Sequence, residues 1–206
     1  MKQKLSVIVL LAFLTLLWSC QFEGAETTED MDLVATAYDA GYDFAGKGTY
    51  SLPDKIVKIT GDATAPPEYI KDIYGIPMLA QIEANMTTLG WTKVDVNASP
   101  DVQFLPGAWT STTIVYGGYY GGYYCWYYPY YCGGGWYYPY YGYSSSYTTG
   151  TLLMTIVDPN MESTDGRLRV VWSGAMNGLL SGTYDIDRIT KGINQCFTQS
   201  QYLKTN

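Results

Sequence analysis

Two apolar runs in the C-terminal half of the chain constrain its fold more than any other feature. The first extends from Leu152 to Ile156 and the second from Leu168 to Met176, and in both an apolar side chain stands at almost every second position. That period of two is typical of one face of a β-strand. Because Asp165-Gly166 between the runs is a turn signal, we expect an antiparallel hairpin with a long loop. Leu153 and Val157 fall on the other face, which indicates cover on both sides of the hairpin.

Two other segments carry apolar residues at helical spacing, three or four positions apart. They are Met78, Ile82, Met86 and Leu89 in the middle of the chain, and Ile186, Ile189, Ile193 and Phe197 near its end. Pro77 suits the first position of the earlier helix, where a missing N–H costs nothing, and Gly90 suits its C-terminal cap. Asp185 and Asp187 suit the first turn of the later helix, where the helix dipole favours carboxylates.

The remaining segments are predicted to be short strands and extended chain. Tyr38 to Thr60 is predicted to be extended, and the expected strands are Thr49–Leu52, Ile56–Ile59, Trp91–Val96, Val102–Phe104 ending before Pro106, and Thr110–Tyr116. Strands that surround one helix and precede another indicate an α+β fold. We therefore predict a mixed or antiparallel β-sheet with two main helices packed on one face and a Tyr/Gly-rich insertion.

That insertion lies in a part of the chain without charge, because no Asp, Glu, Lys or Arg stands between Asp101 and Asp158. The stretch from Tyr116 to Tyr147 holds 15 of the 22 tyrosines and two of the six tryptophans. We call residues 117–147 the aromatic insertion. It contains no acid, base or metal-ligand cluster, so its composition favours contact over catalysis.

Three interpretations of the aromatic insertion remain open: a low-complexity loop, a binding surface and a self-associating segment. Rings with polar edges suit contact with sugars, with peptides or with a membrane interface. If the insertion binds, its candidate contact residues are Tyr119, Tyr120, Tyr123, Tyr124, Trp126, Tyr127, Tyr128, Trp136, Tyr137 and Tyr138.

The N-terminus is predicted to be a secretory signal. Lys2 and Lys4 precede an apolar run from Leu5 to Trp18, which is shorter than the roughly 20 residues that span a bilayer. The run ends in Ser19-Cys20, which resembles a bacterial lipobox and implies cleavage before Cys20 and lipidation of its thiol. A plain signal peptide followed by an accidental cysteine is the alternative. Gln21, rather than Asp, follows the cysteine, and by the same resemblance this implies the outer membrane of a Gram-negative bacterium.

These features divide the chain into three parts. Residues 1–19 are expected to be the signal peptide, residues 20–36 an acidic flexible tether after lipidated Cys20, and residues 37–206 a single α+β domain. Removal of Lys2 and Lys4 leaves ten basic and 19 acidic residues. A chain with that charge repels phosphate backbones, so we expect no nucleic-acid partner.

The other cysteines fit an oxidising compartment. Cys125 and Cys132 flank six residues of the aromatic insertion and form a candidate disulfide, which the sequence alone does not decide. Cys196 lies in the terminal helical pattern beside Phe197, and we expect a buried, inert thiol.

Enzymatic readings find little support in the sequence. The chain contains no histidine, which removes Ser-His-Asp and Cys-His arrangements and the usual zinc ligands. Four aspartates remain as candidates for a carboxylate pair, Asp95, Asp101, Asp158 and Asp165, but all are expected at strand ends or turns, where Asp is common for backbone reasons. We predict no catalytic activity, no cofactor and no metal ion.

Three motifs in order resemble a bacterial lipoprotein family known as domain of unknown function 4136. They are Tyr42-Asp43-Phe44 with Thr49-Tyr50, Gly150-Thr151-Leu152 with Asp158, and Val171-Trp172-Ser173-Gly174. The likeness covers roughly Tyr38 to Tyr202 and implies a lipoprotein with an α+β fold, but no activity. We expect an outer-membrane-anchored, non-enzymatic binding or scaffolding module whose partner is an envelope protein or a glycan. The alternative is a glycan-binding lipoprotein that uses the aromatic insertion.

Overall fold

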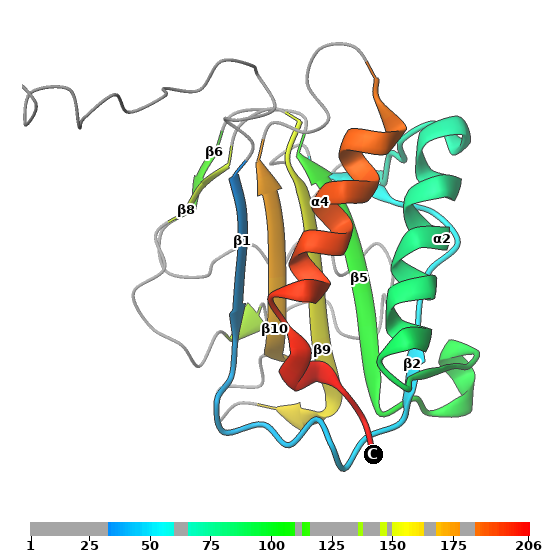
Figure 1. Ribbon diagram of the computed structural model, residues 1–206, viewed down its shortest axis with the longest axis vertical. Coiled ribbons are helices and arrows are strands. Elements are labelled where there is room, and N and C mark those ends of the chain that lie inside the picture. The colour runs from blue at the N-terminus through cyan, green and yellow to red at the C-terminus, as the bar shows by residue number, and fades with distance from the viewer. Residues whose placement is uncertain are drawn as a thin grey trace, which may run out of the picture. The chain divides into compact units, whose positions relative to one another are not determined.

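The computed structural model describes residues 33–59, 66–109, 113–115, 136–137, 145–147, 150–162, 168–177 and 184–206. The predicted signal peptide, Cys20, the Asp165-Gly166 turn, the Cys125–Cys132 pair and the side chains of the aromatic insertion lie outside these residues. The fold of the described chain is the predicted α+β arrangement, in which one mixed sheet carries two helices on one face (Figure 1).

The main sheet has eight strands. They are β1 (Leu33–Tyr38), β2 (Thr49–Ser51), β3 (Val57–Ile59), β4 (Thr92–Lys93), β5 (Val102–Trp109), β7 (Trp136–Tyr137), β9 (Leu152–Glu162) and β10 (Leu168–Asn177). The order is β1-β10-β9-β5-β2-β4, with β3 beside β5 and β7 beside β10. A second sheet pairs β6 (Thr113–Val115) with β8 (Ser145–Tyr147).

The predicted hairpin is confirmed, and it forms the centre of the sheet. β9 and β10 pair antiparallel, with Leu152 opposite Met176 and Ile156 opposite Trp172. β5 joins the other edge of β9 antiparallel, whereas β2 and β3 pair with β5 in parallel. The apolar alternation in β9 and β10 therefore lines one continuous face across three long strands.

Helices α2 (Asp72–Thr88) and α4 (Ile186–Thr198) cover that face (Figure 1). They contact each other through Asn194 of α4, whose side-chain oxygen accepts hydrogen bonds from Gln81 at 2.8 Å and from Asn85 at 2.7 Å. Short 3-10 helices follow β4 and α4, at Val96–Ala98 and Gln201–Leu203. No helix in the described ranges is both long and apolar enough to cross a bilayer.

The predicted ends of the two helices are confirmed with one exception. Gly90 ends α2 with a φ of 92°, a left-handed conformation that favours glycine, and Asp185 caps α4 by accepting hydrogen bonds from the N–H groups of Asp187 and Arg188. The prediction that Pro77 begins α2 is wrong, because the helix starts at Asp72 and contains the proline. A proline in the second turn removes one backbone hydrogen bond, and the packing of the apolar face of α2 outweighs that loss.

One strand was not predicted, one extends beyond its predicted bounds, and one segment predicted to be extended is a loop. β1 begins at Leu33, so the last residues of the segment 20–36 that was expected to be a tether belong to a strand. β5 continues through Pro106 to Trp109; the proline lies between the part of β5 that pairs with β2 and the part that pairs with β3, where a missing N–H is tolerated. Residues 39–48 form a loop rather than a strand.

The core between the helices and the sheet is aromatic. Trp172 is fully buried, and its ring packs 5.8 Å from Phe197 of α4 and 6.0 Å from Phe104 of β5, measured between ring centroids. The indole N–H of Trp172 donates a 2.9 Å hydrogen bond to the hydroxyl of Ser200. Cys196 is also buried, as predicted.

Candidate functional site: a paired carboxylate cluster

The loop between β1 and β2, residues 39–48, is folded by its own aspartates. Oδ1 of Asp39 accepts a backbone N–H two residues on at 2.9 Å, and Oδ1 of Asp43 accepts two backbone N–H groups at 3.1 and 3.3 Å. Such Asx turns hold a loop in one conformation without regular structure. The turns place Tyr42 and Lys47 so that both side chains reach the same carboxylate.

That carboxylate belongs to Asp158 of β9, which is fully buried. Its Oδ2 accepts a 2.8 Å hydrogen bond from the Tyr42 hydroxyl and a 3.2 Å hydrogen bond from Nζ of Lys47. Its Oδ1 accepts the backbone N–H of Asn160 at 2.8 Å. A buried charge is tolerated only when it is paired and hydrogen-bonded, and Asp158 has both kinds of partner.

Tyr42 acts in this arrangement as a hydrogen-bond donor. Burial and then the negative charge of Asp158 raise the pKa of Tyr42 far above that of a free phenol. Its ring packs edge-on against Phe44 with 4.7 Å between centroids, and Nζ of Lys47 lies 5.6 Å from the ring centre. The hydroxyl therefore stays protonated throughout the ordinary pH range.

A second carboxylate, Asp101, fixes the start of β2 to the start of β5. Its Oδ2 accepts hydrogen bonds from the Thr49 hydroxyl at 2.7 Å and from the backbone N–H groups of Thr49 and Gly48 at 2.9 and 3.0 Å. The Thr49 hydroxyl accepts the backbone N–H of Asp101 in return, at 3.0 Å. These bonds, led by the one from the Thr49 hydroxyl, lower the pKa of Asp101.

A third carboxylate, Asp39, forms an ion pair with Nη2 of Arg169 in β10. Arg169 stands directly opposite Asp158 in the β9–β10 register, and its backbone also pairs with Tyr137 of β7. We call Asp39, Tyr42, Lys47, Thr49, Asp101, Asp158 and Arg169 the carboxylate cluster.

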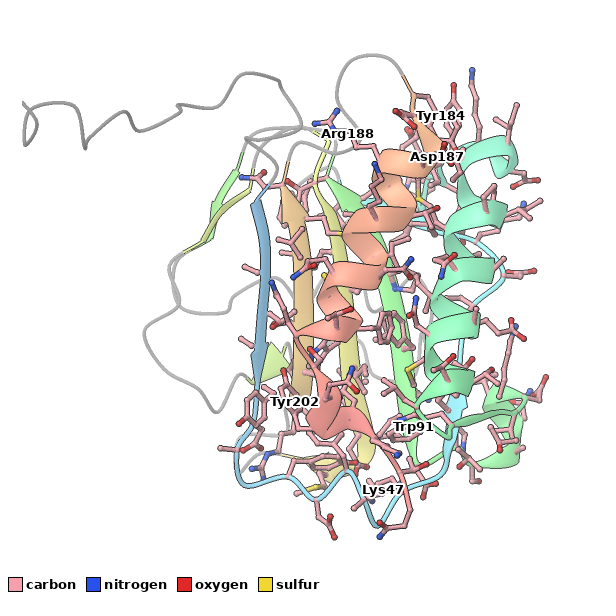
Figure 2. All side chains as sticks on the ribbon, viewed as in Figure 1. Lys47, Trp91, Tyr184, Asp187, Arg188 and Tyr202 are labelled. Atoms are coloured by element: carbon pink, nitrogen blue, oxygen red, sulfur yellow. The ribbon has the colours of Figure 1, made fainter. Side chains whose placement is uncertain are left out.

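The C-terminal residues lie at the same end of the sheet as the cluster. Lys47 and Tyr202 both lie there, whereas Tyr184 lies at the opposite end (Figure 2). The ring of Tyr202 stacks on Tyr38 at 3.8 Å and lies 6.1 Å from Phe44, measured between centroids. The last residues of the domain therefore pack on the loop that carries Tyr42 and Lys47.

The carboxylates of this cluster serve as hydrogen-bond acceptors and ion-pair partners within the protein. Within the cluster, Asp39, Asp101 and Asp158 each accept hydrogen bonds or an ion pair from the protein itself. The described residues contain no group of three or more His, Cys, Asp or Glu side chains placed to hold a metal ion. The cluster therefore joins four segments of the chain through its carboxylates.

Comparison with known proteins places the chain in a family. The model of the family described as Domain of unknown function (DUF4136) matches residues 34–200. The chain belongs to this family. No curated protein matches it significantly.

A solved structure of a family member agrees with this assignment, and two further solved structures match more distantly. A DUF4136 family protein from Bacteroides thetaiotaomicron is 27% identical, with a TM-score of 0.63, over 84% of this chain and 97% of that one. A PelC dodecamer from Paraburkholderia phytofirmans matches at 12% identity and a TM-score of 0.38, over 85% of this chain and 99% of that one. A PDZ domain protein from Parabacteroides distasonis matches at 15% identity and a TM-score of 0.37, over 82% of this chain and 36% of that one.

The three sequence motifs that carry the family resemblance have structural roles in this chain. Tyr42 of the first motif bonds Asp158 of the second, which joins the β1–β2 loop to β9. Gly150 has a φ of 87° and its N–H bonds the carbonyl of Trp109, which brings the chain back beside β5. Trp172 of the third motif bonds Ser200. The residues that carry the resemblance therefore hold the fold together.

The structure brings together only some of the residues that the sequence singled out. Of the four candidate aspartates, Asp101 and Asp158 join the carboxylate cluster, Asp95 caps a 3-10 helix by accepting the N–H of Asn97, and Asp165 lies outside the described residues. The candidate contact residues of the aromatic insertion also lie outside them, except for the β7 backbone of Trp136 and Tyr137.

Sequence reasoning missed the partners of Asp158. It predicted Tyr42 to be part of an extended segment and gave no role to Lys47, although Tyr42 belongs to the first motif of the family resemblance and Lys47 lies between the two parts of that motif. The available signal was the density of Asp and Gly in residues 39–48, which is typical of a turn-rich loop.

Proposed function

We propose that this DUF4136 protein is a lipid-anchored lipoprotein of the bacterial outer membrane whose domain binds or scaffolds an envelope protein without catalysis. One observation carries the non-enzymatic part of the proposal: the carboxylates of the carboxylate cluster accept hydrogen bonds or an ion pair from the protein itself. Asp158, the most buried of them, accepts from Tyr42 and Lys47. A general base needs a free lone pair directed at substrate, and this carboxylate directs its oxygens at protein donors.

The anchor rests on the N-terminal sequence. A basic start, an apolar run from Leu5 to Trp18 and Cys20 form the pattern of a lipoprotein signal. Only 12 residues separate Cys20 from Leu33, the first residue of β1. At about 3.5 Å per residue, this tether keeps the domain within roughly 45 Å of the membrane surface. A domain held so close to the membrane is suited to contacts within the envelope.

A contact role is also supported by the surface of the first turns of α2. Ile73 and Ile76 are 70% and 61% exposed, and Tyr69 just before the helix is 36% exposed. Large apolar side chains grouped on a surface mark contact sites more often than isolated ones do. We propose this group, Tyr69, Ile73 and Ile76, as the contact surface for an apolar patch on an envelope protein.

Acyl labelling in living cells tests the anchor. The full-length chain is expressed in a Gram-negative host fed with an alkyne-bearing fatty acid, and outer membranes are isolated on a density gradient. We expect label and outer-membrane recovery for the natural chain and for Ser19→Ala, and loss of both for Cys20→Ala. Label on Cys20→Ala, or recovery of the natural chain in the soluble periplasmic fraction, contradicts the proposal.

Photo-crosslinking tests the contact surface independently of the anchor. A benzophenone amino acid replaces Ile73 in one variant and Ala84, an exposed residue farther along α2, in the control. We expect a discrete protein adduct from position 73 that is absent from position 84. Equal adducts from both positions, or none from position 73, remove this surface from the proposal.

The glycan alternative rests on the aromatic insertion alone. Tyr and Trp rings stack on sugars, and Trp126 and Trp136 would report such stacking by their fluorescence. We expect no shift when the purified domain is titrated with cell-wall or capsular fragments to millimolar concentration. A saturable shift that disappears in a Trp126→Ala, Trp136→Ala double variant favours the glycan function instead.

A further inference from the structure

We propose that β1 pairs antiparallel with β1 of a second copy of this chain, around a two-fold axis at Thr36. The main sheet then continues from one copy into the other. This inference goes beyond the proposed function, and it depends neither on the lipid anchor nor on the contact surface of α2.

β1 is the last strand on its side of the main sheet (Figure 1). In the part of the chain that the structure describes, it pairs with β10 on one side and with no strand on the other. β6 and β8 do not extend this sheet, because they pair with each other in a sheet of their own. Residues 34–37 are partly exposed and Tyr38 is 40% exposed, whereas all eight residues of the central strand β5 are buried. The outer edge of β1 is therefore accessible to another strand.

The direction of the backbone groups at this edge follows from the pairing of β1 with β10. The N–H of Asp39 donates to the carbonyl of Val171, the residue directly opposite it in the β1–β10 register, at 2.9 Å. In an antiparallel pair, residues that bond the partner strand alternate with residues whose N–H and C=O groups point the other way. Three residues of β1 therefore direct both groups away from β10: Val34, Thr36 and Tyr38. Such a row of donors and acceptors is a template for a further strand.

The other side of the sheet is protected against strand pairing. β4 has only two residues, and Nζ of its Lys93 forms a 2.7 Å ion pair with Glu83 of α2. β3 is covered along its outer side by residues 68–70, where the N–H of Lys58 donates to the carbonyl of Glu68 at 2.7 Å. Short strands, edge lysines and covering chain are the usual means of blocking an edge. β1, by contrast, is six residues long and contains neither a charged residue nor a proline.

The sequence of β1 is complementary to itself in one antiparallel register. This register places Thr36 opposite Thr36 of the second copy, and Val34 opposite Tyr38 of the second copy. All the outward N–H and C=O groups of these three residues then bond, because each residue falls in a hydrogen-bonded pair. A register shifted by two residues pairs only two of the three with each other, so it forms fewer of these bonds.

The side chains that meet in this register are favourable partners. Thr36 lies opposite Gly174, where an added Cβ would face Sγ of Cys196 in α4, so Val34, Thr36 and Tyr38 lie on the helix face of β1. Threonine beside threonine, and an aromatic ring beside a β-branched side chain, are cross-strand pairs that stabilise antiparallel sheets. No charged side chain lies in the paired stretch, so no like charges face each other. An edge that satisfies itself in this way closes around a two-fold axis, which favours a second copy as the occupant.

Amide hydrogen exchange measured by NMR tests the pairing without altering β1. The protein is the mature chain with Cys20→Ser and no lipid. A strand of six residues makes a small interface of the weak class, so exchange is measured at about 1 mM and after about 50-fold dilution. We expect Ala35 and Ala37, whose N–H groups bond β10, to be protected at both concentrations. We expect protection that is lost on dilution for the N–H groups of the outward residues: Val34, Thr36 and Tyr38.

Sedimentation of the same samples gives the mass, which is expected to rise with concentration from that of one chain towards that of two. Two results overturn the proposal. Outward N–H groups that exchange freely at both concentrations show that no strand pairs with this edge. Outward N–H groups that stay protected on dilution show that a segment of the same chain covers it.

Disulfide trapping tests the register. Chains carrying Ser at positions 20, 125 and 132 receive either Thr36→Cys or Val34→Cys and are equilibrated in a glutathione buffer. We expect a disulfide-linked dimer from Thr36→Cys, because the two Cα atoms of a hydrogen-bonded pair lie about 5.5 Å apart, within the range that a disulfide spans. Val34→Cys is the matched control on the same face and edge, since its counterpart lies about 13 Å away along the strand. Equal dimer from both variants, or none from Thr36→Cys, contradicts the two-fold axis at Thr36.

Discussion

The hydroxyl of Tyr42 donates a 2.8 Å hydrogen bond to the buried carboxylate of Asp158, which lies 116 residues farther along the chain. This bond joins the β1–β2 loop to the central strand β9. Its place in the fold implies that the loop contributes to global stability, because opening the loop would leave a buried charge with fewer donors.

Tyr42→Phe is therefore expected to destabilise the domain by about 2 kcal/mol, the usual value for a lost hydrogen bond to a charged group. Urea unfolding followed by tryptophan fluorescence measures the change. Tyr69→Phe is the matched control, because Tyr69 is exposed, and its unfolding free energy is expected to stay within about 0.5 kcal/mol of the natural chain. Equal effects of the two substitutions would show that the Tyr42–Asp158 bond adds nothing.

The Tyr42–Asp158 pair also shows where sequence reasoning succeeds and where it stops. The β9–β10 hairpin was predictable because its signal is local: a period of two over ten residues reports one strand face. β1 was missed because Val34-Ala35-Thr36-Ala37 has small side chains and follows an acidic stretch, so its strand pattern is weak. Tyr42 and Asp158 meet only through the folding of residues 39–48 and the β9 register, and neither is visible in local spacing.

Asp101 is expected to make the stability of the domain sensitive to acid. Hydrogen bonds led by that from the Thr49 hydroxyl lower its folded pKa below the ordinary value of 3.8, so the folded state binds its proton less readily than the unfolded chain does. The stabilisation is fully present above about pH 5 and is lost as the pH falls through the folded pKa.

Thermal unfolding from about pH 6 down to about pH 2.5 measures this loss. Asp101→Asn has no carboxylate to titrate, so its melting temperature is expected to start lower and to fall less steeply with acid than that of the natural chain. Thr49→Val should show an intermediate slope, because it removes the leading hydrogen bond and keeps the charge. Parallel curves for all three proteins would contradict this assignment.

Gly174 is expected to tolerate no side chain. A Cβ built there would lie 2.7 Å from Cη2 of Trp172 and 3.2 Å from Sγ of Cys196. The indole cannot move away freely, because it is buried and bonded to Ser200. Gly174→Ala should cost about 2 kcal/mol, the usual penalty for overpacking a core.

Gly48→Ala is the control for this substitution, because a Cβ at Gly48 would have no neighbour within 4 Å. Urea unfolding of both variants measures the difference. If Gly48→Ala destabilises the domain as much as Gly174→Ala, the loss of stability comes from replacing any glycine. The close approach of Trp172 to Gly174 would then not be its cause.

Cys196 is expected to be unreactive in the native domain. Burial raises the pKa of its thiol to about 12, so almost none of it is thiolate near neutral pH, and its side chain is fully enclosed by the core.

A mature chain carrying Ser at positions 20, 125 and 132 isolates this cysteine. With an aromatic disulfide reagent at about pH 8, reaction should be slow in buffer and at least about 100-fold faster in urea, because only unfolding exposes the thiol. Rapid reaction in buffer would place Cys196 on an open surface and would contradict the packing of α4 on the sheet.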